Sequence, residues 1–323
     1  MQRSASRTIV GLVLGVCLQP MLAAAQAYPV KPVRWIVPFP PGGAADISSR
    51  VIGQKLSEVW GQQVIIDNRP GAAGNVGTEL AARAAPDGYT VVLVPATFTT
   101  YPSLVRKPLF RPDDFAPITL VSSSPLVLVV HPSLPVKNVR ELVALARSQP
   151  GALNYASSGI GASAHMAAEL FKSMTKTRIV HVAYKGQPPA LADLVAGQTQ
   201  LMFPNIPSAL ALVKAKRLRP LAVTTPVRTS MFPELPTVAE SGVPGFEVLQ
   251  WGGLVTAAGT PGTVTDKFQR DVAAVLKQED VRKTFLKYGF DVVGSTPAQF
   301  ADFIRAEIAK WAKIIREANI RAD

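Results

Sequence analysis

The segment VRWIVPFPPGGAADISSRVIGQKL, residues 33–56, decides the fold class of this chain. Its first part, residues 33–39, is apolar apart from Arg34 and predicts a strand, and the turn Pro40-Pro41-Gly42-Gly43 ends it. Apolar residues then recur at near-helical spacing from Ile47 to Leu56, which predicts a helix. A strand that turns through glycines into a helix is the first half of a parallel β-α-β unit.

The same pattern repeats along the chain. Strands are expected at residues 64–66 and 90–94, with a helix between them that ends at about Ala85. A second series opens with an apolar strand at 125–131 and continues with strands at 154–156, 179–182, 201–203 and 221–223. Two α/β units of similar plan therefore follow one another, which predicts two lobes with one sheet each.

The C-terminal part is mostly helical. An extended segment at 248–257 precedes helices at 264–277, 279–288 and 297–318. With so few strands of its own, this part is expected to pack back onto the first lobe. The predicted organisation is then a first lobe over 28–125, a second lobe over 126–248 and a return to the first lobe over 249–323. The chain would cross between the lobes twice, near 120–128 and 248–257, as in a hinged clamshell.

The first 27 residues have the pattern of a secretory signal peptide. Arg3 and Arg7 precede an apolar run over 9–18, and Ala25-Gln26-Ala27 provides a small-x-small cleavage site. Cleavage is expected after Ala27, and the alternative is an uncleaved anchor or a lipoprotein signal on Cys17. Because Cys17 is the chain's one cysteine, a cleaved protein would contain no disulfide and no catalytic thiol.

The chain is basic, with a formal net charge of +12. A nucleic acid or a membrane surface would be a natural partner for a concentrated basic patch. The Lys and Arg residues are scattered, however, and the densest group, residues 214–219, contains no aromatic side chain. The charge therefore predicts a solvated basic surface that favours anions in general.

Four loops that lead from strands into helices are rich in glycine or small hydroxyl residues. They are residues 41–43, 71–77, 157–163 and 184–186. A helix start exposes unpaired N–H groups and a partial positive charge, so it can hold an oxyanion, and glycine lets that anion approach the backbone. Taken alone, Pro41-Gly42-Gly43 favours an ordinary strand-to-helix turn, and it is the recurrence of such loops in both predicted lobes that favours an anion site. No G-x-x-x-x-G-K-[ST] phosphate loop occurs.

Enzymatic chemistry has little support in the sequence. The three histidines are His131 at a strand end, His181 within a strand and His165 at a helix start. Neither H-E-x-x-H nor G-x-S-x-G occurs, and the carboxylates are not spaced as metal ligands. We therefore expect no catalytic residue, no metal and no cofactor.

A set of motifs in one order resembles a known family. These motifs are Val37-Pro38-Phe39-Pro40-Pro41-Gly42-Gly43-x-x-Asp46, Asn68-Arg69-Pro70-Gly71-Ala72-x-Gly74, Pro86-Asp87-Gly88-Tyr89-Thr90, Tyr155-Ala156-Ser157-Ser158-Gly159-x-Gly161, Tyr184-Lys185-Gly186 and Pro236-Thr237-Val238-Ala239-Glu240-Ser241-Gly242. They resemble the TctC or Bug (Bordetella uptake gene) family, the solute-binding receptors of tripartite tricarboxylate transporters. The resemblance extends from Tyr28 to the C-terminus.

The resemblance implies an α/β fold of the two-lobed, type II-like periplasmic-binding-protein class (a Venus flytrap) with two hinge strands. It also implies that the lobes close on a carboxylate held by backbone N–H groups and ordered water. By position, the ligand-binding residues would be Phe39, Pro41, Gly42, Gly43, Asp46, Thr97, Ser157, Ser158, Gly159, Ser163, His165, Tyr184, Lys185, Gly186 and Asn205. Ala183 and Gln187-Pro188 depart from the family pattern beside Tyr184-Lys185-Gly186 and are expected to reshape that wall.

The implied function is that of a monomeric periplasmic receptor that delivers a small carboxylate to a tripartite tricarboxylate permease. The carboxylate could be a dicarboxylate, a tricarboxylate, an amino acid or an aromatic acid. Two alternatives remain open at this point. One is a ligand sensor for a signalling protein, which would have the same binding site, and the other is a periplasmic enzyme, which would turn its ligand over.

Overall fold

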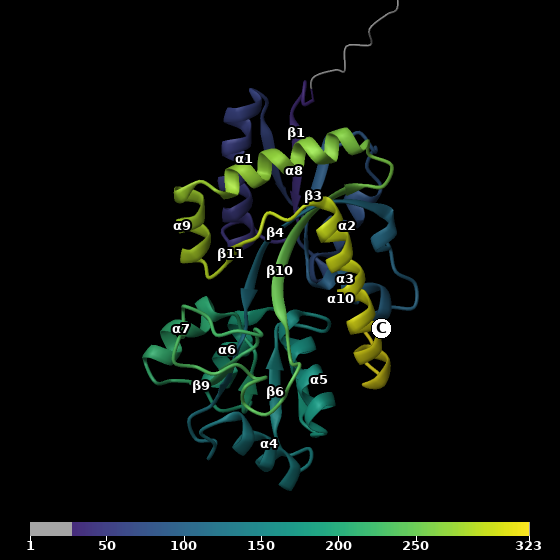
Figure 1. Cartoon of the computed structure of the whole chain (residues 1–323). Coiled ribbons are helices and arrows are strands. Elements are labelled where there is room, and N and C mark those ends of the chain that lie inside the picture. The colour runs from purple at the N-terminus through teal and green to yellow at the C-terminus, as the bar shows by residue number, and fades with distance from the viewer. Residues whose placement is uncertain (1–27, 323) are drawn as a thin grey trace, which may run out of the picture.

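The structure is a computed structural model that describes residues 28–322. It shows two α/β lobes, one above the other in Figure 1, joined by β4, β10 and α10. The expected signal peptide, residues 1–27, lies outside the described residues. Within the described part of the chain, no helix is both long and apolar enough to cross a membrane.

The first lobe is built on a six-stranded sheet of order β11-β4-β10-β3-β1-β2. The strands β1, β2 and β3 are parallel, and β10 and β11 are antiparallel to their neighbours. The strand bounds are β1 Val33–Val37, β2 Val64–Asn68, β3 Thr90–Pro95, β4 Phe115–Pro125, β10 Leu249–Ala257 and β11 Asp291–Val292.

Helices cover both faces of this sheet because its strands carry apolar side chains on both sides. One face packs against α1, α8 and α9, where Trp35 meets Ile52 and Phe268. The other face packs against α2, α3 and α10, where Phe98 and Phe300 are buried. The helix bounds are α1 Ala44–Trp60, α2 Asn75–Ala82, α3 Thr97–Leu104, α8 Gly262–Leu276, α9 Glu279–Lys287 and α10 Pro297–Glu317.

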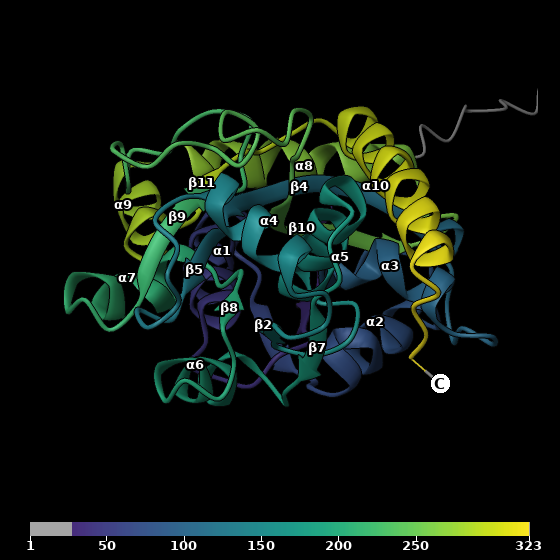
Figure 2. The same ribbon diagram turned by 90° about the horizontal axis from the view of Figure 1, so that it is seen from below.

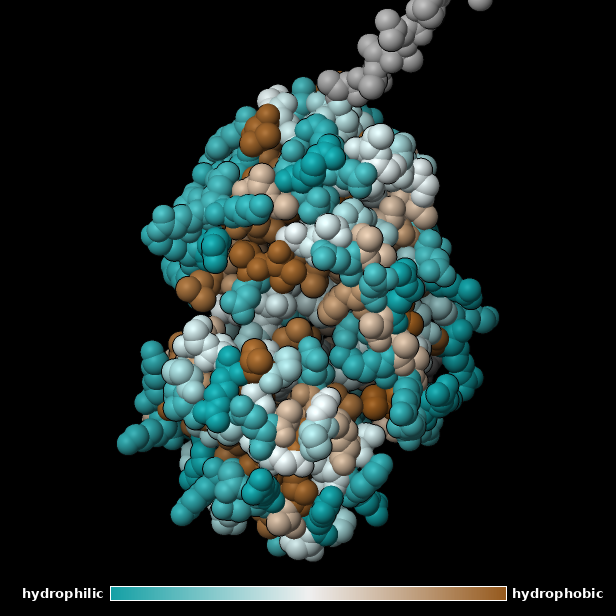
Figure 3. Space-filling view, in the orientation of Figure 1, coloured by the Kyte–Doolittle hydropathy of each residue, from teal (hydrophilic) through white to brown (hydrophobic). Residues whose placement is uncertain are grey.

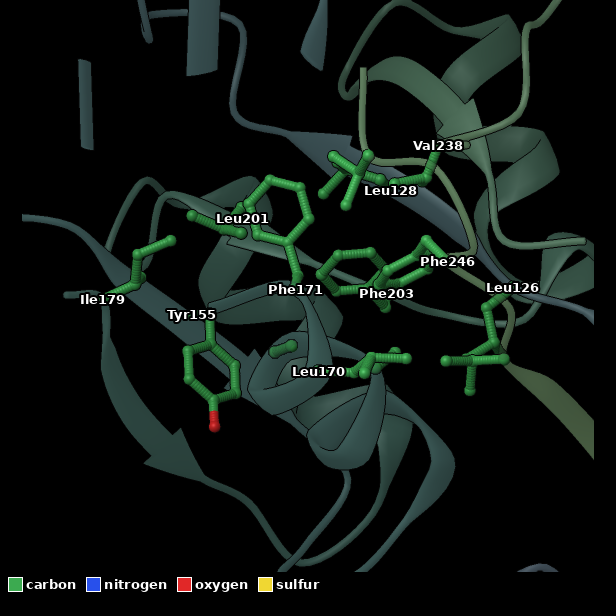
Figure 4. Packing of buried hydrophobic residues seen from close by; sticks show 14 of the residues in the cluster. Leu126, Leu128, Tyr155, Leu170, Phe171, Ile179, Leu201, Phe203, Val238 and Phe246 are labelled. Carbon is green, nitrogen blue, oxygen red and sulfur yellow. The ribbon is translucent and has the colours of Figure 1, made fainter. Parts of the chain in front are cut away.

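The second lobe has a five-stranded sheet of order β7-β6-β8-β5-β9. Helices α4 and α5 cover one face, and α6 and α7 cover the other. Figure 4 shows the aromatic centre of the first of these cores, where Phe171, Phe203 and Phe246 lie together. The bounds are β5 Val127–Val130, β6 Asn154–Ser157, β7 Val180–Ala183, β8 Leu201–Met202, β9 Arg219–Val223, α4 Val139–Ser148, α5 Ser163–Thr175, α6 Gln187–Val195 and α7 Ile206–Lys214.

Two strands carry the chain between the lobes. At Leu126 the chain passes from β4 into β5, and at Val248 it returns into β10, whose Leu249 pairs with Pro125. Buried Thr224 connects the two crossings. Its Oγ1 accepts a hydrogen bond from the N–H of Leu126 at 2.9 Å and donates one to the carbonyl of Val248 at 2.7 Å.

Helix α10 forms a third link. Its first half buries Phe300 and Ile304 in the core of the first lobe, whereas Trp311, Ile314 and Ile315 near its end are part of the core of the second lobe. Figures 1 and 2 both show the helix running beside α3 and α5. The segment 249–323 was expected to return to the first lobe, and the structure shows that it packs on both lobes.

Candidate functional site

A cavity of about 870 Å³ lies between the lobes. Residues of the first lobe from α1, α2, β3 and α3 form one side of it, and residues 158–160, 162–164 and 185–187 of the second lobe form the other. On the face drawn in Figure 3, hydrophobic residues gather at the waist where the two lobes meet.

Five helices begin at this cavity, α1, α2, α3, α5 and α6, and four of them share a feature at the N-terminus that α3, α8 and α9 also have. None of α1, α2, α5 and α6 has a side-chain hydrogen bond at its N-cap, and the N-cap residues are Gly43, Gly74, Ala162 and Gly186. Helices α4, α7 and α10 are capped by Asn138, Asn205 and Thr296. The first-turn N–H groups of α1, α2, α5 and α6 are therefore available to an external acceptor.

All four helix starts reach the cavity wall, through Ala45, Asn75, Ser163 and Gln187. Each helix has at least eight residues, so each contributes a partial positive charge at its N-terminus. Two of these helices belong to each lobe. A single oxyanion between the lobes would therefore meet donors from both sides.

In the first lobe, buried Asp46 organises the loop before α1. Its carboxylate accepts hydrogen bonds from the Gly42 N–H at 2.9 Å, from Asn68 Nδ2 at 2.9 Å and from Arg50 Nε at 3.0 Å. Burial by itself raises the pKa of Asp46, but these hydrogen bonds outweigh it and hold the pKa below its ordinary value. Asp46 is thus ionised and shapes the loop, and its side chain does not line the cavity.

The neighbouring loop of the first lobe, residues 71–75, also lies on the cavity wall. Its backbone is left-handed at Ala72 and Ala73, with φ of 45° and 56°. Non-glycine residues rarely adopt this conformation, so the surrounding structure must hold the loop in place. Thr97 does so by donating a hydrogen bond from its Oγ1 to the carbonyl of Ala73 at 2.9 Å.

In the second lobe, the two cavity loops are bonded to each other through their backbones. The N–H of Tyr184 donates to the carbonyl of Ser157 at 3.1 Å, and the N–H of Gly186 donates to the carbonyl of Ser158 at 3.2 Å. A hydrogen bond also crosses between the lobes, from Thr100 Oγ1 to the carbonyl of Gly161 at 3.2 Å.

A side chain at position 161 would be strained. The φ of Gly161 is +80°, and a Cβ there would lie 2.5 Å from Cδ1 of Leu104 in α3. The close approach of this loop to the first lobe therefore depends on the missing side chain.

The electrostatic character of the cavity favours an anion. Among its lining residues within 28–322, Lys185 is the one charged side chain, and no carboxylate is present. The remaining wall is largely apolar, with contributions from Phe39, Ile160, Trp251 and Phe290. The cavity combines a positive set of helix starts with apolar walls that suit a hydrocarbon body.

The structure divides the ligand-binding residues expected from the sequence into two groups. Those that line the cavity are Phe39, Thr97, Ser158, Gly159, Ser163, Lys185 and Gly186. Those that do not line it are Pro41, Gly42, Gly43, Asp46, Ser157, His165, Tyr184 and Asn205. Two members of the second group contact the helix that begins at the cavity with Gln187: Asn205 Oδ1 accepts a hydrogen bond from Gln187 Nε2 at 3.2 Å, and Tyr184 donates one from its hydroxyl to Asp193 at 2.7 Å.

Some lining residues were absent from the expected site, and they include Asn75, Thr100, Tyr101, Gln250, Trp251 and Phe290. Asn75 follows the Gly71–Gly74 turn, so that glycine-rich loop was a usable signal for it. Gln250 and Trp251 lie just beyond the second crossing, where a residue must face the space between the lobes. Ala322, near the end of the chain, also lines the cavity, and its N–H donates to the carbonyl of Leu104 at 3.1 Å.

Two α/β lobes, joined by two strands and enclosing a cavity rimmed by helix N-termini, define the class of two-lobed solute-binding proteins. Comparison with known proteins identifies the family within that class. The family model of the tripartite tricarboxylate transporter family receptor matches residues 48–320. The chain therefore belongs to this family, which is periplasmic, as the motifs predicted.

Two relatives and three solved structures illustrate the similarity. A "UPF0065 protein in tcbD-tcbE intergenic region" of Pseudomonas sp. (strain P51) is 38% identical, and the match covers 92% of this chain and 89% of the relative. "Protein BugT" of Bordetella pertussis (strain Tohama I) is 34% identical, with 92% of each chain covered.

Among solved structures, R. palustris Rpa4515 with adipate has a TM-score of 0.80 and 37% identity, covering 91% of this chain and 99% of the other. MatC (Rpa3494) from Rhodopseudomonas palustris with bound malate has a TM-score of 0.77 and 30% identity, covering 89% and 100%. The predicted two-lobed periplasmic-binding-protein fold is thereby confirmed. A further similar structure is that of the periplasmic binding protein BugD, with a TM-score of 0.77 and 31% identity, covering 91% of this chain and 99% of the other.

Proposed function

We propose that this protein captures a small carboxylate between its lobes and performs no chemistry on it. The observation that carries the proposal is the convergence of four helix N-termini without side-chain caps, two from each lobe, on one cavity. Lys185 adds the one charged side chain among the described lining residues. A carboxylate oxygen accepts hydrogen bonds from such amides, whereas a cation would find no carboxylate partner among these residues.

The expected binding energy is adequate for a receptor. A hydrogen bond to a charged group contributes about 1.5–3 kcal/mol net. Four or five such bonds exceed the roughly 4 kcal/mol or more that association costs. Micromolar affinity requires about −8 kcal/mol, and burial of a hydrocarbon body against the apolar wall adds to the total.

The ligand class follows from the same wall. Adipate and malate, the ligands of two similar structures, are both dicarboxylates. The apolar residues Phe39, Trp251 and Phe290 favour a carboxylate with a hydrocarbon or aromatic body over a compact polyanion. In this proposal, the residues that contact the ligand are the lining members of the expected site, with Asn75 and Gln187 added.

The proposed partner is the membrane permease of a tripartite tricarboxylate transporter, which would receive the ligand in the periplasm. Family membership supports this partner. Closure of the lobes on the ligand would present a surface that the open form lacks, so the permease would distinguish loaded from empty receptor.

The test is direct. Native mass spectrometry of the purified protein should detect a co-purifying carboxylate, and calorimetry on protein stripped by unfolding and refolding should show binding of adipate or malate. Small-angle scattering of the stripped protein should show a smaller radius of gyration at saturation. A ligand without a carboxyl group, or a carboxylate recovered as a reaction product, would contradict the proposal.

A further inference from the structure

A buried polar cluster lies directly behind the cavity loop Ser157–Gly161. It consists of Tyr155 on β6, His165, Glu169 and Lys172 on α5, and His181 on β7. None of these five side chains lines the cavity. The two histidine rings stack with their centroids 4.1 Å apart, and the Tyr155 ring stacks on His181 at 4.7 Å.

His165 is bonded to one end of the loop. Its Nδ1 accepts a hydrogen bond from the Gly161 N–H at 3.0 Å, and the residue is 2% exposed. Because Nδ1 is the acceptor, the ring proton must reside on Nε2, which faces Glu169 Oε1 at 4.0 Å. This arrangement requires the uncharged imidazole, since the imidazolium has no acceptor.

His181 is bonded to the other end of the loop. Its Nε2 lies 2.6 Å from Ser157 Oγ, and that hydroxyl also accepts a hydrogen bond from the Gly159 N–H at 3.2 Å. The Ser157 hydroxyl is thereby occupied within the loop. The two histidines thus hold residues 157–161 from behind, one at each end.

The surroundings of both rings favour the uncharged form. Burial, the neighbouring His181 and the Lys172 ammonium lower the pKa of His165 to about 3. Burial also lowers the pKa of His181 to about 4; Glu169 opposes this shift and Lys172 adds to it. The carboxylate of Glu169 is already paired, because Tyr155 and Lys172 both donate to its Oε1 at 2.5 Å.

We propose that His165 and His181 are positioning residues for the anion site: as a pair of neutral rings, they fix the loop Ser157–Gly161 in the conformation that presents its backbone to the ligand. The inference rests on the proposed function only for its effect on ligand affinity. The effect on the loop itself does not depend on which ligand binds.

The position of Gly161 extends this role to the contact between the lobes. Its N–H is held by His165 and its carbonyl accepts the hydrogen bond from Thr100 of α3. The same peptide segment therefore connects the histidine pair, the cavity loop and the first lobe. Loss of the His165 acceptor should loosen the loop and this bridge together.

Matched substitutions separate the hydrogen bond from packing. In His165→Asn the side-chain oxygen can occupy the place of Nδ1, whereas His165→Leu keeps the volume and removes the acceptor. Likewise, His181→Gln keeps a polar atom near the place of Nε2, and His181→Leu removes it. Amide hydrogen exchange read by NMR should be faster at Gly161 in His165→Leu and at Gly159 in His181→Leu, by tenfold or more, while the Asn and Gln variants stay near wild type.

The readouts on wild-type protein avoid any folding defect of the variants. Nitrogen-15 NMR should show His165 as the neutral Nε2–H tautomer, and neither histidine should titrate between about pH 5 and 8.

Adipate affinity should fall at least tenfold in the Leu variants and recover in Asn and Gln. Titration of either ring in that range, or unchanged Gly161 exchange in His165→Leu, would overturn the inference. If wild-type protein binds neither adipate nor malate, the proposed ligand fails while the exchange and tautomer results still decide this question.

Discussion

Replacement of Thr224 by valine tests how the two crossings are held together. The substitution keeps the shape of the side chain and removes the hydroxyl, which accepts from the Leu126 N–H at 2.9 Å and donates to the Val248 carbonyl at 2.7 Å. The backbone hydrogen bonds of Thr224, from its N–H to the Leu126 carbonyl and to its carbonyl from the Val248 N–H, remain. The change therefore isolates the contribution of the side chain.

The magnitude follows from burial. Thr224 and Val248 are 0% exposed and Leu126 is 2% exposed, so water does not replace the lost partner. A buried donor or acceptor without a partner costs about 1–3 kcal/mol. We expect the free energy of unfolding to fall by about 2–4 kcal/mol, which lowers the Tm by roughly 3–6 °C for a chain of this size.

Urea denaturation followed by circular dichroism measures the loss, with Thr224→Ser as the control. Serine retains the hydroxyl and loses one methyl group, so it should destabilise by about 1 kcal/mol at most. A valine variant within about 0.5 kcal/mol of wild type would refute the reasoning. So would a serine variant that is as unstable as valine.

Three further predictions concern the site. Lys185→Met should weaken adipate binding about tenfold at low salt and less at high salt, whereas Lys185→Arg should leave the affinity near that of wild type. Calorimetry at two salt concentrations measures this, and a loss of affinity that does not depend on salt would contradict an electrostatic role. Gly42→Val places a β-branched residue at φ +82°, so affinity should fall strongly with the circular dichroism spectrum unchanged, and unaltered affinity would remove that loop from the site. Because the pKa of Asp46 is lowered in the folded state, ionised Asp46 stabilises the fold at a pH above its unfolded pKa of about 3.9, and this stabilisation is lost as the pH falls through the lower folded pKa. The urea midpoint should therefore fall less between pH 7 and pH 3 in Asp46→Asn than in wild type. An equal fall in both proteins would contradict this.

Local sequence was sufficient for the elements that carry strong periodicity. The strand and helix of residues 33–56 and the last helix, expected over 297–318 and found as α10 over Pro297–Glu317, show this. The glycine-rich loops were also predictable, since a strand that ends in glycines before a helix places free N–H groups at the edge of a sheet.

Helix α3 illustrates what was not predictable. Its segment, Thr97 to Leu104, contains three threonines and Pro102, all of which have low helix propensity. The helix forms because Phe98 and Leu104 are buried in the cores of the two lobes. Tertiary packing thus overrides local preference, and the cavity residues Thr100 and Tyr101 were missed with it.

The division of the expected site residues has a similar cause. Motif positions identify a loop but not which of its atoms face the ligand. Asp46, Ser157 and His165 lie in the elements that flank the cavity loops, yet their side chains point away from the cavity and bond to the backbone of those loops. Such orientation depends on partners distant in sequence, such as His181 for Ser157.

The anchoring of α10 in both lobes restricts how the receptor can open. Because α10 packs on both lobes, the lobes cannot rotate relative to each other by bending at the two crossing strands alone. The cavity must open on the side of the molecule away from α10. The last turns of α10 must then shift against the second lobe or bend. The N–H of Ala322 is bonded to the carbonyl of Leu104 and Ala322 lines the cavity, so the segment that follows α10 also belongs to the wall between the lobes.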